Sequence, residues 1–72
     1  MTETETPIEV GQRVGRAIAR DVLAEDMPRE WVGIDPQDGD QLTGAGIEPD
    51  TSEWDAAVAA AERAYHELVG EE

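Results

Sequence analysis

The sequence contains no cysteine, no lysine and no phenylalanine, and aromatic residues make up only 4% of its 72 residues. Without cysteine, neither a disulfide nor a thiolate metal site can reinforce the fold. There is one histidine, His66, and one serine, Ser52, and no glycine-rich turn flanks that serine. Neither a catalytic triad nor a zinc site can be built from this set. We therefore expect a protein that is not an enzyme and needs no cofactor.

Long apolar runs are also missing. None approaches the roughly 20 residues that a helix needs to cross a bilayer. The acidic segment 1–7 lacks the basic and apolar regions of a signal peptide. We therefore expect a cytoplasmic protein with no membrane contact.

Positive charge is scarce, because five arginines face 18 acidic residues and the formal net charge is −13. Such a charge disfavours direct binding to nucleic acid and favours a protein partner with a basic surface. The acids are spread evenly, with six in each of residues 1–27, 28–50 and 51–72. This composition resembles that of proteins from extreme halophiles. A second hypothesis is a phage-type acidic inhibitor that imitates nucleic-acid phosphates and occupies a basic protein groove.

Large apolar residues are few, since leucine, isoleucine and valine together contribute 13 residues. A single domain of this size is marginally stable by itself. We therefore expect a homo-oligomer in the form of a homodimer, whose second copy buries additional apolar surface.

The first predicted helix covers about residues 8–26. Thr6 and Pro7 are typical of a cap and a first helical turn. Apolar residues recur with helical spacing up to Val22, and Met27-Pro28 ends the pattern. Residues 1–7 are predicted to form a flexible acidic tail.

The second predicted helix covers about residues 52–69. Asp50, Thr51 or Ser52 can cap it, and Glu53 follows Asp50 at the spacing of a capping box. Gly70 can end the helix, after which residues 71–72 are expected to fray.

The segment between these helices, residues 28–50, contains three prolines and four glycines. We predict an irregular, turn-rich connector that holds either a short hairpin or a helical turn. In the hairpin version, residues 31–34 form a strand or an apolar clip and Asp38-Gly39 forms a tight turn. Four apolar residues of the connector are expected to pack on the helices: Trp31, Ile34, Leu42 and Ile47.

The predicted fold is mainly α, a single domain over residues 8–70 in which the two helices pack antiparallel. A stripe of small residues, Gly11, Gly15 and Ala19, is expected to face small residues of the second helix, in this chain or in a second copy. The full set predicted for helix packing or a dimer interface is Gly11, Val14, Gly15, Ile18, Val22, Trp31, Trp54, Val58, Ala61, Tyr65 and Leu68.

Two clusters are candidates for partner binding. The first is an arginine stripe opposite the apolar face of the first helix, which either grips a carboxylate or phosphate or is a solvated helix face: Arg13, Arg16 and Arg20. The second is the acidic middle of the connector: Asp35, Asp38 and Asp40. These acids do not fit the spacing of a calcium-binding EF-hand loop in either register, so a weak divalent-metal module is a lesser alternative to a solvated loop. We predict a small, acidic, non-enzymatic protein-interaction domain.

Overall fold

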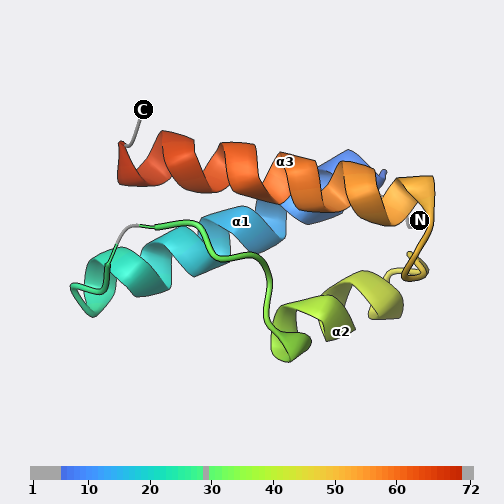
Figure 1. Ribbon diagram of the computed structural model, residues 1–72, viewed down its shortest axis with the longest axis horizontal. Coiled ribbons are helices and arrows are strands. Elements are labelled where there is room, and N and C mark those ends of the chain that lie inside the picture. The colour runs from blue at the N-terminus through green and yellow to red at the C-terminus, as the bar shows by residue number, and fades with distance from the viewer. Residues whose placement is uncertain (1–5, 29, 71–72) are drawn as a thin grey trace, which may run out of the picture.

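The structure is a computed structural model that describes residues 6–28 and 30–70 (Figure 1). It contains the helices α1 (Pro7–Ala24), α2 (Pro36–Gly44) and α3 (Ser52–Val69). No strand occurs in the described residues, so the mainly α prediction is confirmed. Of the tail predicted over residues 1–7, residues 1–5 lie outside the described part of the chain, as does the predicted fraying at 71–72, whereas Thr6 caps α1 and Pro7 is its first residue.

Helix α1 begins with a capping box. The Glu9 amide donates to the Thr6 hydroxyl at 3.2 Å, and the Thr6 amide donates to the Glu9 carboxylate at 3.1 Å. The helix ends at Ala24, slightly earlier than predicted. Its end is set by the backbone of Asp26, which adopts a left-handed φ of 55° and turns the chain before Pro28.

Helix α2 shows that the helical-turn version of the connector was right and the hairpin version was wrong. Asp35 caps this helix, because its side chain accepts from the Asp38 amide at 3.1 Å, and Pro36 occupies the first turn. Asp38 and Gly39 therefore lie inside a helix instead of in a tight turn, and residues 31–34 form an irregular segment that leads into it.

Helix α3 has the predicted bounds, and the structure selects Thr51 among the three candidate caps. The Trp54 amide donates to the Thr51 hydroxyl at 3.1 Å. The alternative capping box of Asp50 with Glu53 is not formed, because Asp50 adopts a φ of 63° and lies outside the cap position. Gly70 ends the helix in the left-handed conformation, as predicted.

Helices α1 and α3 run parallel, so the predicted antiparallel arrangement was wrong. Gly11 meets Ala57 and Gly15 meets Ala61, so the paired positions advance together along both helices. Figure 1 shows both helices running in the same direction, with α2 on one side of the pair. An 18-residue helix is about 27 Å long, and residues 25–51 supply enough chain to return over that length.

The contact between α1 and α3 requires glycine at two positions. A Cβ atom built at Gly11 would overlap the Ala57 carbonyl and lie 2.9 Å from the Ala57 Cα atom. One built at Gly15 would overlap the Ala61 carbonyl in the same way. The small-residue stripe therefore faces α3 of its own chain and is not available to a second copy. The homo-oligomer stays a prediction.

Two groups of buried side chains fill the core. Val10, Val14, Leu42, Ile47 and Ala57 form one group beneath α2. Ala19, Val22, Tyr65 and Val69 form the other, at the opposite end of the helix pair. The connector is held on the helices as expected. Leu42 and Ile47 are buried in the first group, and Ile34 and Trp31 pack against the first and second groups.

Leu68 was expected to lie in the core or in an interface. Within the single chain the residue is instead 44% exposed, and the neighbouring Val69 is buried. The heptad spacing that singled out Leu68 assumes two helices that coil around each other. Here α1 and α3 cross (Figure 1), so the buried side of α3 rotates toward Tyr65 and Val69 near its end. Other residues of the predicted seam, Trp54 and Val58, are partly buried against the first core group.

Candidate functional site

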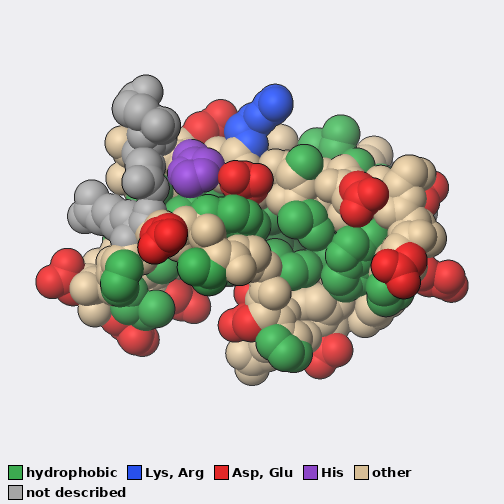
Figure 2. Space-filling view, viewed as in Figure 1, with side chains coloured by type: hydrophobic (Ala, Val, Ile, Leu, Met, Phe, Trp, Pro, Cys, Tyr) green, Lys and Arg blue, Asp and Glu red, His purple; other side chains and the backbone are tan. Residues whose placement is uncertain are grey.

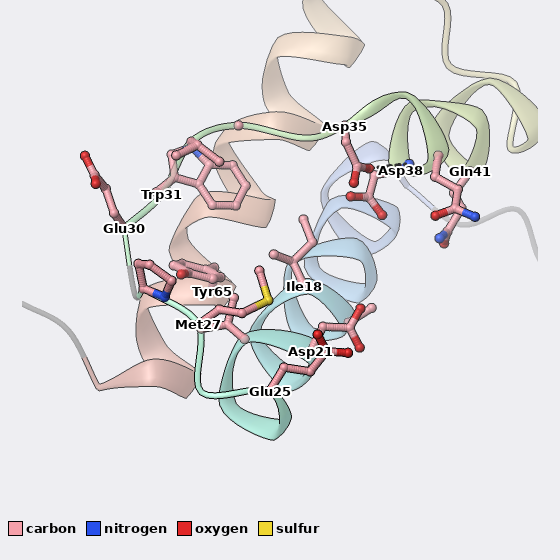
Figure 3. Close-up of a pocket in the computed structure, with 16 residues that line it drawn as sticks. Ile18, Asp21, Glu25, Met27, Glu30, Trp31, Asp35, Asp38, Gln41 and Tyr65 are labelled. Atoms are coloured by element: carbon pink, nitrogen blue, oxygen red, sulfur yellow. Dashed lines mark hydrogen bonds between the residues drawn. The ribbon is translucent and has the colours of Figure 1, made fainter.

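A pocket of about 620 Å³ opens beside the second half of α1. Its walls come from α1, from the connector between α1 and α2, and from the first turns of α2, while α3 contributes Tyr65 (Figure 3). This volume is in the range of pockets that bind small molecules or a few residues of a peptide.

One end of the pocket is aromatic and apolar. The rings of Trp31 and Tyr65 lie with centroids 5.3 Å apart and are inclined by 54°. Met27 and Val32 border this end and are 45% and 86% exposed. Hydrophobic side chains also run across the middle of the face seen in Figure 2, with acidic side chains scattered on all sides. Apolar surface at this end is therefore available to a partner.

Tyr65 places a polar atom in this apolar surrounding. The residue is only 1% exposed, and its hydroxyl oxygen is buried with no hydrogen-bond partner among the residues that the structure describes. A buried hydroxyl without a partner is costly and uncommon in folded proteins. Tyr65 is among the residues that line the pocket, but its hydroxyl is covered by the surrounding side chains and does not open into it.

The other end of the pocket is acidic. In Figure 3 the Asp35 and Asp38 carboxylates lie on one side of Ile18, and Asp21 lies on the other. The described lining residues include five acids and no base: Asp21, Glu25, Glu30, Asp35 and Asp38. Glu30 is at the aromatic end, where its side chain points away from the other acids (Figure 3).

The carboxylates of Asp35 and Asp38 interact directly. Partial burial raises the pKa of Asp38 to about 6, and the hydrogen bond and negative charge of Asp35 and the charge of Asp21 add to the rise. The same hydrogen bond, together with the Asp38 amide, lowers the pKa of Asp35. Negative charge is thus crowded between α1 and α2, where a cation would relieve it.

The end of α1 adds to this negative field. The last turn of α1 contains no basic residue; Asp21 lies in it, and Glu25 is the C-cap that follows it. Because the C-terminus of a helix carries partial negative charge, acids at this position are unfavourable. Helix α3 follows the usual rule, with acids in its first turn and His66 in its last. Helix α1 therefore departs from this charge preference at the end that borders the pocket.

The structure brings only two of the predicted partner-binding residues, Asp35 and Asp38, together in the pocket. Arg13, Arg16 and Arg20 are exposed on α1 and do not line the pocket. Asp35 and Asp38 line it, whereas Asp40 is exposed and does not. Sequence reasoning missed Asp21 and Glu25, although two acids four residues apart near a helix C-terminus were a signal.

The residues that the structure describes contain no group of three or more His, Asp or Glu side chains placed to hold a metal ion. None of the three described helices is long and apolar enough to cross a membrane.

Comparison with known proteins gives no relative from which a function could be transferred. No protein-family model matches the sequence, and no curated protein or solved structure matches the chain.

Proposed function

We propose that this protein is a non-enzymatic interaction domain that binds a basic segment of a partner protein in the pocket between α1 and α2. The observation that carries the proposal is the charge of the pocket: five acids and no base among its described lining residues, around an apolar interior. Electrostatic complementarity of this kind guides partner choice and speeds association.

The two ends of the pocket define the chemistry of the segment. The acidic end, at Asp21 and Asp38, suits a cationic side chain. The aromatic end, at Trp31 and Tyr65, suits an apolar side chain. A peptide that carries a basic residue next to an apolar one matches both ends, and most of its binding energy would come from a few buried contacts.

The test is an NMR titration of the labelled protein with a short capped peptide that contains arginine and leucine. The two tryptophans give separate indole signals, and only Trp31 lines the pocket. We expect the Trp31 signal to shift and the Trp54 signal to stay. A peptide with glutamate in place of each arginine is the matched control. Equal shifts with both peptides, or none with either, would rule the proposal out.

The acidic inhibitor that imitates nucleic acid remains the competing hypothesis. Mimicry of a phosphate backbone favours acids arranged in a row on one surface. On the face seen in Figure 2, the acidic side chains are scattered instead. The direct experiment is competition between this protein and duplex DNA for a basic DNA-binding protein. If the wild-type protein and variants that lack the pocket acids displace the DNA equally well, the result favours mimicry.

A further inference from the structure

Three of the five large apolar residues that are exposed in the described part of the chain lie away from the pocket: Ile8, Leu23 and Leu68, at 51%, 42% and 44% exposure. On α1, Gly11 and Gly15 mark the side that contacts α3. At 100° per residue, Ile8 and Leu23 lie on the side of these glycines that is opposite to the pocket. Leu68 lies near the end of α3, where the crossing of the helices leaves it uncovered. The helix pair is therefore covered on one side by α2 and the connector and is bare on the other.

We call the bare side of the helix pair the outer face. It consists of the three exposed residues and two half-buried ones between them: Ile8, Gln12, Leu23, Ala60 and Leu68. Helices normally bury such an apolar side against a further layer. Two 18-residue helices side by side present a face about 27 Å long and about 18 Å wide, roughly 500 Å². This is close to the area that each partner contributes to a small specific interface.

The charges around the helix pair indicate which partner the outer face suits. Residues 30–50, which form α2 and its flanking segments, contain six acids and no base, whereas four of the five arginines belong to α1 and α3. Arg16 lies in line with Leu23, seven residues away on α1. Neither Arg16 nor Arg20 has an acid three or four positions away on that helix. The outer face is therefore where a second chain of charge −13 meets the least repulsion.

We infer that the outer face is a homodimer interface, in which its exposed apolar side chains pack against the outer face of a second copy and Arg16 pairs with carboxylates of that copy. A two-fold contact of this kind uses the same surface on both chains. It also supplies the apolar burial that a single chain of this size lacks. The inference goes beyond the proposed function, because it concerns the side of the helix pair opposite to the pocket.

Sedimentation equilibrium of the full chain, from micromolar to millimolar concentration, measures the association. We expect a monomer–dimer equilibrium that is at least about tenfold tighter in about 2 M KCl than in about 0.1 M KCl, because salt screens the repulsion between the two copies. A chain that stays monomeric at millimolar concentration in both solutions would overturn the inference.

Apolar-to-serine variants locate the interface. Leu23→Ser and Leu68→Ser each remove an apolar side chain from the outer face, and Val32→Ser makes the same kind of change at an 86% exposed position that lines the pocket. We expect each of the first two to weaken the dimer by at least about tenfold, because the change occurs twice in the dimer. The third should leave the dimer unchanged within about twofold. A dimer that resists both leucine changes, or that Val32→Ser weakens equally, would place the contact elsewhere and refute the inference.

A second pair of variants tests the charge argument without removing apolar surface. Arg16→Gln and Gln37→Glu each lower the net charge by one, the first beside Leu23 and the second in α2, where Gln37 lines the pocket. In about 0.1 M KCl we expect Arg16→Gln to weaken the dimer by about fivefold and Gln37→Glu by less than about twofold. The difference should disappear in about 2 M KCl. Equal losses in dilute salt would mean that only net charge matters and would remove Arg16 from the interface.

Discussion

At the scale of single residues, Tyr65 combines almost complete burial with a hydroxyl that has no partner among the described residues. Its ring is part of the second core group and packs near Trp31. The ring therefore stabilises the fold while the hydroxyl opposes it.

Tyr65→Phe should therefore raise the free energy of unfolding, by about 0.5–1 kcal/mol, because it removes an unsatisfied buried hydroxyl and keeps the packing. Urea denaturation followed by circular dichroism measures this change. Tyr65→Leu is the control for the ring and should destabilise the protein. A Tyr65→Phe variant that is less stable than the wild type would mean that the hydroxyl has a partner in the free protein.

At the scale of elements, the close approach of α1 to α3 depends on Gly11 and Gly15. Helix propensity alone disfavours glycine in a helix interior. Packing reverses this preference here, because the backbone of α3 occupies the space that a side chain would need.

Gly15→Ala should destabilise the domain by at least about 2 kcal/mol, because the added methyl group forces the two helices apart. Gly39→Ala in α2 is the matched control. Its Cβ would meet Trp54 at 3.5 Å, an ordinary contact, so the gain in helix propensity should stabilise the protein by about 0.5–1 kcal/mol. Thermal melting compares the two. Similar melting temperatures for both variants would contradict the observed helix contact.

The contact between α1 and α2 brings Asp38 near Asp35 and Asp21, and it makes stability depend on pH. The pKa of Asp38 is about 6 in the folded protein and 3.8 without the fold. The folded state therefore binds more protons than the unfolded state between these values. Protonation removes the repulsion, so the unfolding free energy should rise as the pH falls from about 7 to about 5.

Asp38→Asn should raise the melting temperature at neutral pH and flatten this pH dependence, because the neutral amide does not titrate. Melting curves at several pH values measure both effects. Asp40→Asn changes an exposed position of α2 that does not line the pocket, and it should keep the wild-type slope. The same slope in both variants would assign the pH dependence to the general negative charge instead.

At the scale of the whole molecule, 18 acidic residues and five basic ones give a net charge of −13 on 72 residues. Repulsion among these charges opposes folding in dilute buffer, and salt screens it over distances of about 10 Å at 0.1 M. We propose that part of this charge is an adaptation to salty solvent, as the halophile-like composition indicates, and that the pocket uses the remainder.

The melting temperature should therefore increase with KCl concentration from low salt to several molar, and circular dichroism follows it. If helix forms only at high salt, adaptation to solvent explains most of the charge. Full folding and an unchanged melting temperature in dilute buffer would contradict the adaptation and would point to the acidic surface as a binding surface. Potassium glutamate in place of KCl tests whether the effect is simple screening.

The local sequence determined the helices at both ends of the domain. Thr6-Pro7 and Thr51 provide caps, and Gly70 provides a left-handed end, so the bounds of α3 and the start of α1 follow from residues close in the chain. The connector was harder to predict, because Gly39 and Gly44 weaken the helical pattern of α2 while the cap at Asp35-Pro36 strengthens it.

The tertiary structure alone decided the direction of α3, the exposure of Leu68 and the pocket. The glycine stripe predicted a close helix contact, but such a stripe fits parallel and antiparallel partners equally well. The path of residues 25–51 makes the choice. That path also brings Asp38 of α2 toward Asp21 of α1 and places Tyr65 of α3 beneath Trp31. These residues are far apart in sequence, so no local pattern could show that they share one pocket.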